Sequence, residues 1–430
     1  MEERLVLNYL CRFNYRICIS TVTLISIFYI SPFFDAITGF LIGKGVFSTN
    51  SPFSPSQLFR FTITLVMLCQ LSGKQLIISS VILLGLIAVE LFAFINYTYI
   101  GGLLSGIIAS YKITFILILY YTLHNYLKNN IITTTKLIKF CVFSSVIYSI
   151  IIVISDVLGI SFGSYGEGIG SKGIFASANG LGIFIGVGSL LSLYIYEKTQ
   201  KKIYLFYILL FCYVLINLMS KAAFIGIIFT ILLYFYYQST NKKIIIGSIA
   251  ALLIAIFSSQ IIEFINTASE IVVFRWNNTN NLSDFLMSGR TNYIETAIEK
   301  YNISGLLIYR LLIGGGYFMS FRNPDKSNFW ESSSSFLEAE LFDMFFMWGI
   351  VGLIIFIFIW IRAFITLSRS KRQYNLILKS VLLMLFIHSS IAGHVLFNGM
   401  SVIALSTIFA ISFSKKIKYE STIPIKTDII

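Results

Sequence analysis

Apolar runs of about 17 to 25 residues, the length of a transmembrane helix, recur along the whole chain. A helix of about 20 apolar residues crosses the roughly 30 Å of hydrocarbon in a bilayer. The composition agrees, since 57% of the residues are hydrophobic and 12% are charged, whereas a soluble domain averages about 25% charged residues. The sequence therefore predicts an all-α polytopic membrane protein.

The apolar runs predict about twelve transmembrane helices. They are expected at residues 15–34, 58–72, 75–96, 102–123, 137–158, 180–196, 203–219, 222–238, 244–262, 342–361, 377–396 and 399–414. These helices divide the chain into three regions. Residues 1–262 contain helices one to nine with short loops, residues 263–341 form one large loop, and residues 342–430 contain helices ten to twelve and a tail.

Basic residues predict the orientation of these helices, because cytoplasmic loops of membrane proteins collect Lys and Arg. The chain has 32 Lys and Arg against 19 Asp and Glu, and the cations lie in short clusters between the apolar runs. This distribution indicates membrane orientation and argues against nucleic-acid binding. With the N-terminus inside, most cations lie on the cytoplasmic side, both termini are cytoplasmic, and residues 263–341 face outward.

Residues 263–341 form the longest predicted connection, and they contain charged and aromatic residues, glycines and a serine run. Structureless loops beyond about 12–15 residues are uncommon unless they are functional or disordered. Apolar residues recur at helical spacing within Thr291–Tyr301, and Asn292 with Glu295 matches a capping pair. We therefore expect a small folded lid on the outer face.

This outward loop is unusually rich in cations for its side of the membrane. It contains Arg275, Arg290, Arg310, Arg322 and Lys326. Arg290 lies at the start of the expected helix, where free N–H groups and the helix dipole favour a phosphate, and its guanidinium adds a bidentate donor. The alternative is a solvated arginine or a structural ion pair with Asp284 or Glu295.

Three charged residues lie in or beside the predicted helices. Lys221 lies at an outward turn between two helices, where it either snorkels to the surface or holds an anion. Glu90 and Lys112 lie inside the third and fourth helices, about 9 Å and about 15 Å below the outer surface at a rise of 1.5 Å per residue. A buried Glu90–Lys112 pair is therefore feasible, and it could be functional or structural.

The sequence lacks the spacing that metal sites require. His124, His388 and His394 form no His-x-x-x-His pattern, and the five cysteines show no disulfide or metal spacing. Phosphate-binding P-loops, G-x-S-x-G elbows and nucleic-acid modules are also missing from the sequence. We expect neither a metal nor another cofactor.

Several short motifs occur in a characteristic order. They are Phe175-Ala-Ser-Ala-Asn-Gly-Leu-Gly182, Ser220-Lys221, Ser288-Gly289-Arg290, Gly314-Gly315-Gly316-Tyr317, Glu338-Ala339 and Gly349-Ile-Val-Gly352. With these motifs, residues 165–365 resemble the O-antigen polymerase and ligase superfamily (Wzy and WaaL). The resemblance implies an all-helical, metal-independent glycosyltransferase of the C type in the bacterial inner membrane. It would act on the outer face and use sugars carried by undecaprenyl diphosphate.

Two departures favour the polymerase branch of this superfamily. The ligase pattern has a His followed by Asn, Ser or Gln, nine residues and Gly-x-x-Gly, whereas this chain has Glu338 and Ala339. The common Ser-Arg pair is Ser220-Lys221 here, which keeps the charge and loses the bidentate fork. A ligase that transfers the polymer to lipid A core is the alternative within this class. A flippase for the same lipid-linked oligosaccharide is the alternative outside it, although the chain shows no matching halves.

Glycosyl transfer from a diphosphate assigns roles to individual residues. Without a metal, fixed cations must stabilise the leaving diphosphate, and we expect Arg290 and Lys221 to bind it, with Arg310 and Arg322 as further candidates. Glu338 is the expected base for the acceptor hydroxyl. The expected partners are the undecaprenyl-diphosphate-linked oligosaccharide, membrane lipid, a chain-length regulator and a flippase. The sugars, the linkage and the choice between O-antigen and capsule stay open.

Overall fold

The computed structural model describes residues 18–48, 51, 53–97, 100–164, 170–243, 287, 290–303, 307–317, 336–370 and 374–414. Within these ranges the chain is helical, and an isolated β-bridge joins Gly163 to Ser171. The expected span at 244–262 and most of the loop 263–341 lie outside the described residues.

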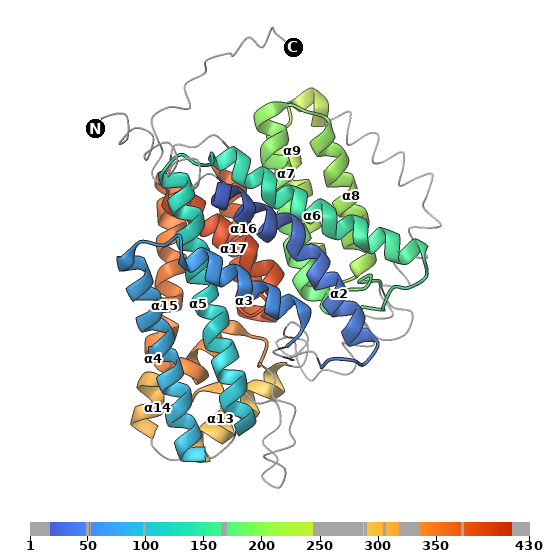
Figure 1. Cartoon of the computed structure of the whole chain (residues 1–430). Coiled ribbons are helices and arrows are strands. Elements are labelled where there is room, and N and C mark those ends of the chain that lie inside the picture. Colours follow the sequence, from blue (N-terminus) through green and yellow to red (C-terminus); the bar gives the residue numbers. More distant parts are fainter. Residues whose placement is uncertain are drawn as a thin grey trace, which may run out of the picture.

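The helices follow the apolar runs closely. A π-helical turn at Ser26–Ile30 leads into α2 (Ser31–Gly43), which is followed by α3 (Pro55–Leu68), α4 (Gly73–Tyr97), α5 (Ile100–Lys128), α6 (Thr134–Val157), α7 (Ala178–Thr199), α8 (Ile203–Leu218), α9 (Lys221–Tyr237), α13 (Arg290–Ile303), α14 (Leu307–Ile313), α15 (Glu340–Arg369), α16 (Asn375–Ala392) and α17 (Gly399–Phe413). Figure 1 shows their arrangement.

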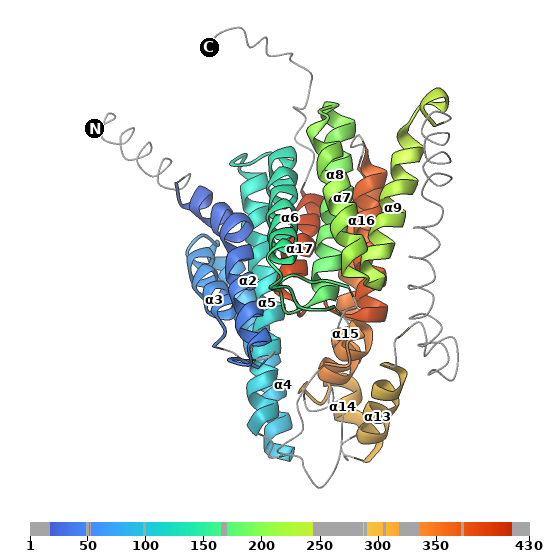
Figure 2. The same ribbon diagram turned by 90° about the vertical axis from the view of Figure 1, so that its right-hand side faces the viewer.

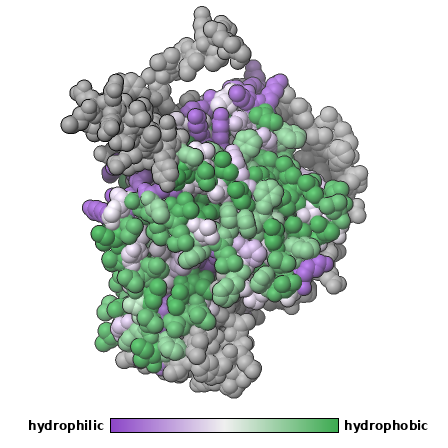
Figure 3. Space-filling model, viewed as in Figure 1, coloured by the Kyte–Doolittle hydropathy of each residue, from purple (hydrophilic) through white to green (hydrophobic). Residues whose placement is uncertain are grey.

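Seven helices in the described part are long and apolar enough to cross a membrane. They are Cys18–Gly43, Gly73–Asn96, Gly102–Lys128, Thr134–Val157, Ala178–Thr199, Glu340–Arg369 and Asn375–Ala392, and α8, α9 and α17 are shorter apolar helices. Apolar side chains also cover the visible side of the bundle in Figure 3. The chain is therefore a multi-pass helical membrane protein.

Helix α7 lies at the centre of the bundle, and 89% of the residues in its most apolar stretch are buried. It packs against α6, α8, α9, α16 and α17. Gly186 of α7 meets Gly226 of α9 so closely that a Cβ on Gly226 would lie 2.9 Å from the Gly186 Cα atom. Small residues of this kind let two membrane helices approach at backbone distance. Helix α4, in contrast, lies at the periphery and exposes Ile77, Leu84 and Ile95.

Helix α15 is interrupted near its start. Trp348 and Gly349 have non-helical backbone angles, so the preceding carbonyls lose their partners within the helix. The backbone N–H groups of Gly315 and Gly316 donate to the carbonyls of Phe346 (2.9 Å) and Met347 (3.0 Å). The glycine-rich motif at 314–317 therefore packs its backbone against the interruption in α15.

The segment at 314–317 also provides the hydrogen-bond partner of Glu90. The backbone N–H of Tyr317 donates to Glu90 Oε2 at 2.8 Å, while Lys112 Nζ lies 5.7 Å from the centre of the Phe336 ring. No ion pair joins Glu90 to Lys112 in the described part of the chain. The expected pair between these residues is therefore wrong, because a backbone amide from the 314–317 segment occupies the Glu90 carboxylate.

Two helices from the large loop lie at one end of the bundle. Figures 1 and 2 both place α13 and α14 there. Helix α14 packs on α15, and Tyr309 lies against Phe92 of α4. The predicted helix at 291–301 is confirmed, but it begins at Arg290. Asn292 therefore lies inside its first turn and is not the cap.

Candidate functional site

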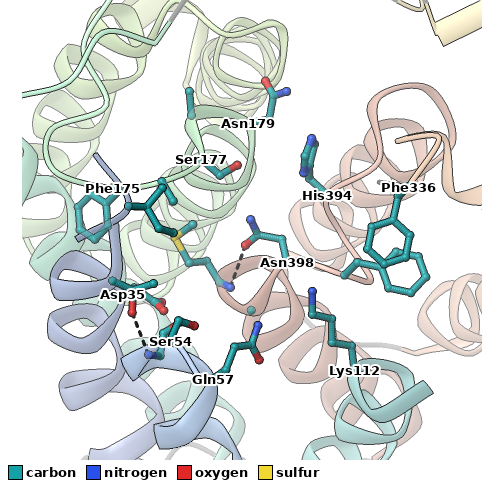
Figure 4. Close-up of a pocket in the computed structure, with 18 of the residues that line it drawn as sticks. Asp35, Ser54, Gln57, Lys112, Phe175, Ser177, Asn179, Phe336, His394 and Asn398 are labelled. Carbon is teal, nitrogen blue, oxygen red and sulfur yellow. Dashed lines mark hydrogen bonds between the residues drawn. The ribbon is translucent and has the colours of Figure 1, made fainter. Parts of the chain in front are cut away.

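A polar cavity of about 480 Å³ lies among the helix ends on one side of the bundle. Figure 4 shows part of its wall. The lining residues come from the α2–α3 connection, α5, the segment before α7, the start of α15 and the α16–α17 connection. Because these segments are distant in sequence, the packing of the helices creates the cavity.

Several helices begin at this cavity. Its lining includes Ser54 and Ser56 at the start of α3, Ser177 to Asn179 at the start of α7, Glu340 at the start of α15, and Asn398 and Gly399 at the start of α17. The first N–H groups of a helix lack partners within the helix, and the N-terminus carries the positive end of the dipole. Each of these helix ends therefore contributes the positive end of its dipole to the cavity wall.

The side chains of two cap residues order the starts of α7 and α17. Ser177 Oγ accepts from the N–H of Gly180 at 3.1 Å, and Asn398 Oδ1 accepts from the N–H of Met400 at 3.0 Å. The two helix starts also touch, because Gly180 leaves room for the Asn398 amide. The motif at residues 175–182 therefore builds a cavity wall.

A buried ion pair forms another wall. Arg60 on α3 donates to Asp35 Oδ1 of α2 at 2.5 Å and to Ser56 Oγ at 3.2 Å. Tyr148 on α6 donates to the second Asp35 oxygen at 2.5 Å. The Arg60 side chain is 9% exposed, and its Nε atom is buried without a partner. The Asp35 charge is thus fully engaged, while the guanidinium keeps a free donor.

Lys112 and Lys172 are the lysines on the cavity wall. In Figure 4, Lys112 points from α5 into the cavity, toward the side that carries Asn398 and His394. No carboxylate of the described residues lies within ion-pairing distance of Lys112. Lys172 donates to the carbonyl of Ala176 at 3.3 Å, and burial lowers the pKa of Lys172. Within the part of the chain that the structure describes, neither ammonium group forms an ion pair with a carboxylate.

Glu338 lines the cavity beside two basic side chains. Its Oε2 accepts from Arg290 at 2.9 Å, and His394 Nε2 lies 3.6 Å from the same oxygen. Arg290 also donates to the carbonyl of Met287 at 3.0 Å, and its side chain is 8% exposed. Glu338 and His394 line the cavity, whereas Arg290 supports Glu338 from behind.

The backbone at Glu338 and His394 is strained. Both residues have positive φ angles, 60° for Glu338 and 64° for His394, which side chains other than glycine rarely adopt. Gly393 also has a positive φ angle of 64°, and a Cβ there would lie 2.8 Å from the backbone carbon of Glu338. Strained backbone of this kind clusters at functional sites.

Two buried carboxylates at the start of α15 hold the segments that carry Glu338 and His394. Glu340 Oε1 accepts from the N–H groups of Val395 at 2.7 Å and Leu396 at 2.6 Å. Asp343 Oδ1 accepts from the N–H of Leu337 at 2.9 Å. Both carboxylates therefore position these segments, and Asp343 keeps its second oxygen buried without a partner.

The residues predicted from sequence occupy different places. Glu338 lines the cavity, whereas Lys221, Arg290 and Arg310 are not among its lining residues. Lys221 is the first residue of α9, after the buried cap Ser220. Arg310 is buried, with its guanidinium 4.7 Å from the centre of the Tyr301 ring. Arg322 lies outside the described residues, as do Arg275 and Lys326.

Sequence reasoning missed six titratable residues of the cavity, namely Asp35, Arg60, Lys172, Glu340, Asp343 and His394. A signal existed for the first two, because charged residues beside an outward loop and inside apolar runs need partners. His394 had been considered as a metal ligand and set aside for its spacing. Its position opposite Glu338 depends on tertiary contacts, so the linear sequence carries no signal for it.

The described residues contain no group of three or more His, Cys, Asp or Glu side chains that could hold a metal ion. Comparison of the sequence with known protein families finds no matching family model, and comparison with curated proteins finds no match. The functional conclusion therefore depends on the cavity.

Proposed function

We propose that the protein is a glycosyltransferase that polymerises oligosaccharide repeats carried by undecaprenyl diphosphate, as an O-antigen polymerase does. The observation that carries the proposal is a polar cavity set among helix N-termini inside an apolar bundle, with two lysines that have no carboxylate partner among the described residues. The reaction takes place on the outer face of the bacterial inner membrane, toward which residues 263–341 are oriented by the distribution of cations.

The chemistry of a diphosphate leaving group fits this cavity. Negative charge on the diphosphate grows as the bond between the sugar C1 and the phosphate oxygen breaks. Lys112, Lys172 and Arg60 line the cavity, and fixed positive charges in a site of low dielectric constant stabilise such developing charge most strongly. In this proposal they bind the diphosphate. The assignment of Arg290 and Lys221 to the same group stays a prediction.

The carboxylates on the wall do not oppose this assignment. Asp35 is engaged by Arg60 and Tyr148, Glu338 by Arg290, and Glu340 by backbone amides and Ser389. Each of these three carboxylates therefore has its own donors, while Asp343 accepts from Leu337 through Oδ1 and keeps a buried Oδ2 without a partner. Within the described residues no carboxylate forms an ion pair with Lys112 or Lys172, so the lysine charges are left for a ligand. A polyprenyl chain can lie along the apolar surface of the bundle in the membrane while its diphosphate enters the cavity.

The test is polymerisation by the purified protein in lipid vesicles supplied with the undecaprenyl-diphosphate-linked repeat. We expect a ladder of longer lipid-linked glycans that forms equally well in excess EDTA. In a strain without the gene, we expect lipopolysaccharide capped with single repeats. Complete loss of repeats from lipopolysaccharide would instead indicate a ligase or a flippase, and failure of the purified protein to extend the repeat would refute the polymerase.

Lys172 gives this proposal a pH dependence. A lysine is charged below its pKa, and burial lowers the pKa of Lys172, so its charge is lost at a lower pH than that of an ordinary lysine. We expect the KM for the donor to rise at a pH below the ordinary lysine pKa of about 10.4. Lys172→Arg should flatten this rise, because arginine stays charged.

The matched control is Lys44→Arg, since Lys44 is exposed beyond the end of α2 and does not line the cavity. Donor KM measured as a function of pH should be the same for the control and the wild type. If Lys172→Arg also reproduces the wild-type curve, Lys172 does not contact the diphosphate.

A further inference from the structure

We propose that His394 accepts the proton of the acceptor hydroxyl, and that Glu338 positions and stabilises the imidazole. This inference depends on the proposed glycosyl transfer and adds to it a residue outside the motifs that resemble the superfamily. The geometry behind it is that His394 and Glu338 face each other across 3.6 Å on the wall of the cavity.

Glu338 alone is poorly suited to take up the proton. Its Oε2 atom already accepts from Arg290 at 2.9 Å, and an adjacent guanidinium favours the charged carboxylate. An imidazole has no such constraint, since one nitrogen can face a carboxylate while the other accepts a proton. With the N–H of His394 on Nε2, toward Glu338, the Nδ1 atom is the free acceptor.

The surrounding backbone is built to hold this pair. Glu338 and His394 are both in the left-handed region, and their segments touch at Gly393. Glu340 binds the amides that follow His394, and Asp343 binds the amide that precedes Glu338. These contacts hold two strained residues in place from several sides. Backbone strain persists only where the surrounding structure fixes the residue in this way.

The charged and titratable groups around His394 come from several elements. They are Glu338 before α15, Glu340 and Asp343 in α15, Arg290 in α13, His388 in α16 and Lys112 in α5. Glu340 and Asp343 accept from backbone amides, and Glu338 is the carboxylate of the described residues that lies within ion-pairing distance of the imidazole.

The step balances as follows. The acceptor oxygen forms a bond to C1 of the donor sugar, and the bond from C1 to the diphosphate oxygen breaks. The leaving diphosphate takes the bonding electron pair, while the acceptor proton moves to His394 Nδ1. The resulting imidazolium is stabilised by Glu338, and it later releases the proton to water.

His394→Asn tests this role, because asparagine tolerates the left-handed conformation and cannot act as the base. General bases contribute about 10²- to 10⁴-fold, so we expect kcat to fall at least about 100-fold with little change in donor KM. The matched control is His124→Asn, at the far end of α5, which should keep wild-type kcat.

Two further readouts separate chemistry from structure. His394→Gly keeps the backbone conformation accessible and leaves space, so added imidazole should restore turnover. Glu338→Gln should lower kcat with little change in donor KM, because a carboxylate no longer stabilises the imidazolium.

The results distinguish this inference from the proposed function. If wild-type protein polymerises the repeat while His394→Asn keeps its kcat, the role of His394 is refuted and the polymerase stands. If His394→Gly is inactive and imidazole has no effect, His394 has only a structural role. If wild-type protein transfers no sugar, the proposed function fails and the base fails with it.

Discussion

Replacing Lys112 by methionine should reduce glycosyl transfer by at least about 100-fold without destabilising the protein. Loss of one fixed donor that stabilises developing negative charge costs about 10²- to 10³-fold in kcat. Lys112 carries a charge inside a membrane helix with no carboxylate partner among the described residues, and such a charge is costly to bury. Methionine has a similar shape and removes that cost.

The diagnostic result is therefore a combination of two measurements. Turnover of the lipid-linked repeat should collapse, while the thermal midpoint in detergent should equal or exceed the wild-type value. Lys44→Met is the matched control, since it removes an exposed lysine that does not line the cavity. Wild-type turnover in Lys112→Met would show that this lysine does not bind the diphosphate. The main observation behind the proposed function would then no longer support it.

Replacing Gly349 by alanine should destabilise the protein by about 3 kcal/mol or more. Gly349 has φ 65° and ψ −167°, a region that is essentially restricted to glycine and costs other residues about 1–3 kcal/mol. A Cβ at this position would also lie 2.4 Å from the carbonyl oxygen of Leu312. Because that oxygen belongs to the backbone, it cannot move without shifting α14.

Gly85→Ala is the control for this prediction. Gly85 lies in the middle of α4, and a Cβ there would meet nothing within 4 Å. Alanine is the better helix former by about 1 kcal/mol, so this variant should match or exceed the wild-type thermal midpoint. Equal midpoints for Gly349→Ala and Gly85→Ala would show that α15 can be continuous at this point.

The Gly-x-x-Gly motif at residues 349–352 illustrates how a sequence motif and its structural reason differ. From sequence it supported a resemblance to a family of glycosyltransferases. In the structure, Gly349 permits the interruption of α15, and the carbonyls before it bind the amides of Gly315 and Gly316. Two motifs that were read separately therefore form one contact.

The helices could be predicted from sequence because the thickness of a bilayer sets a length that is visible in the order of the residues. The apolar runs at 75–96, 137–158 and 203–219 correspond closely to α4, α6 and α8. Glu338 could also be predicted, since it occupies a motif position within a single short segment.

The cavity could not be predicted in this way, because its chemistry depends on contacts between segments far apart in the chain. Arg60 of α3, Lys172 before α7 and His394 between α16 and α17 meet where the ends of helices α3, α7 and α17 converge. Apolar periodicity determines that a segment lies in the membrane, but it does not determine which neighbours that segment faces. Helix packing decided that Glu90 binds a backbone amide and that Lys112 reaches the cavity.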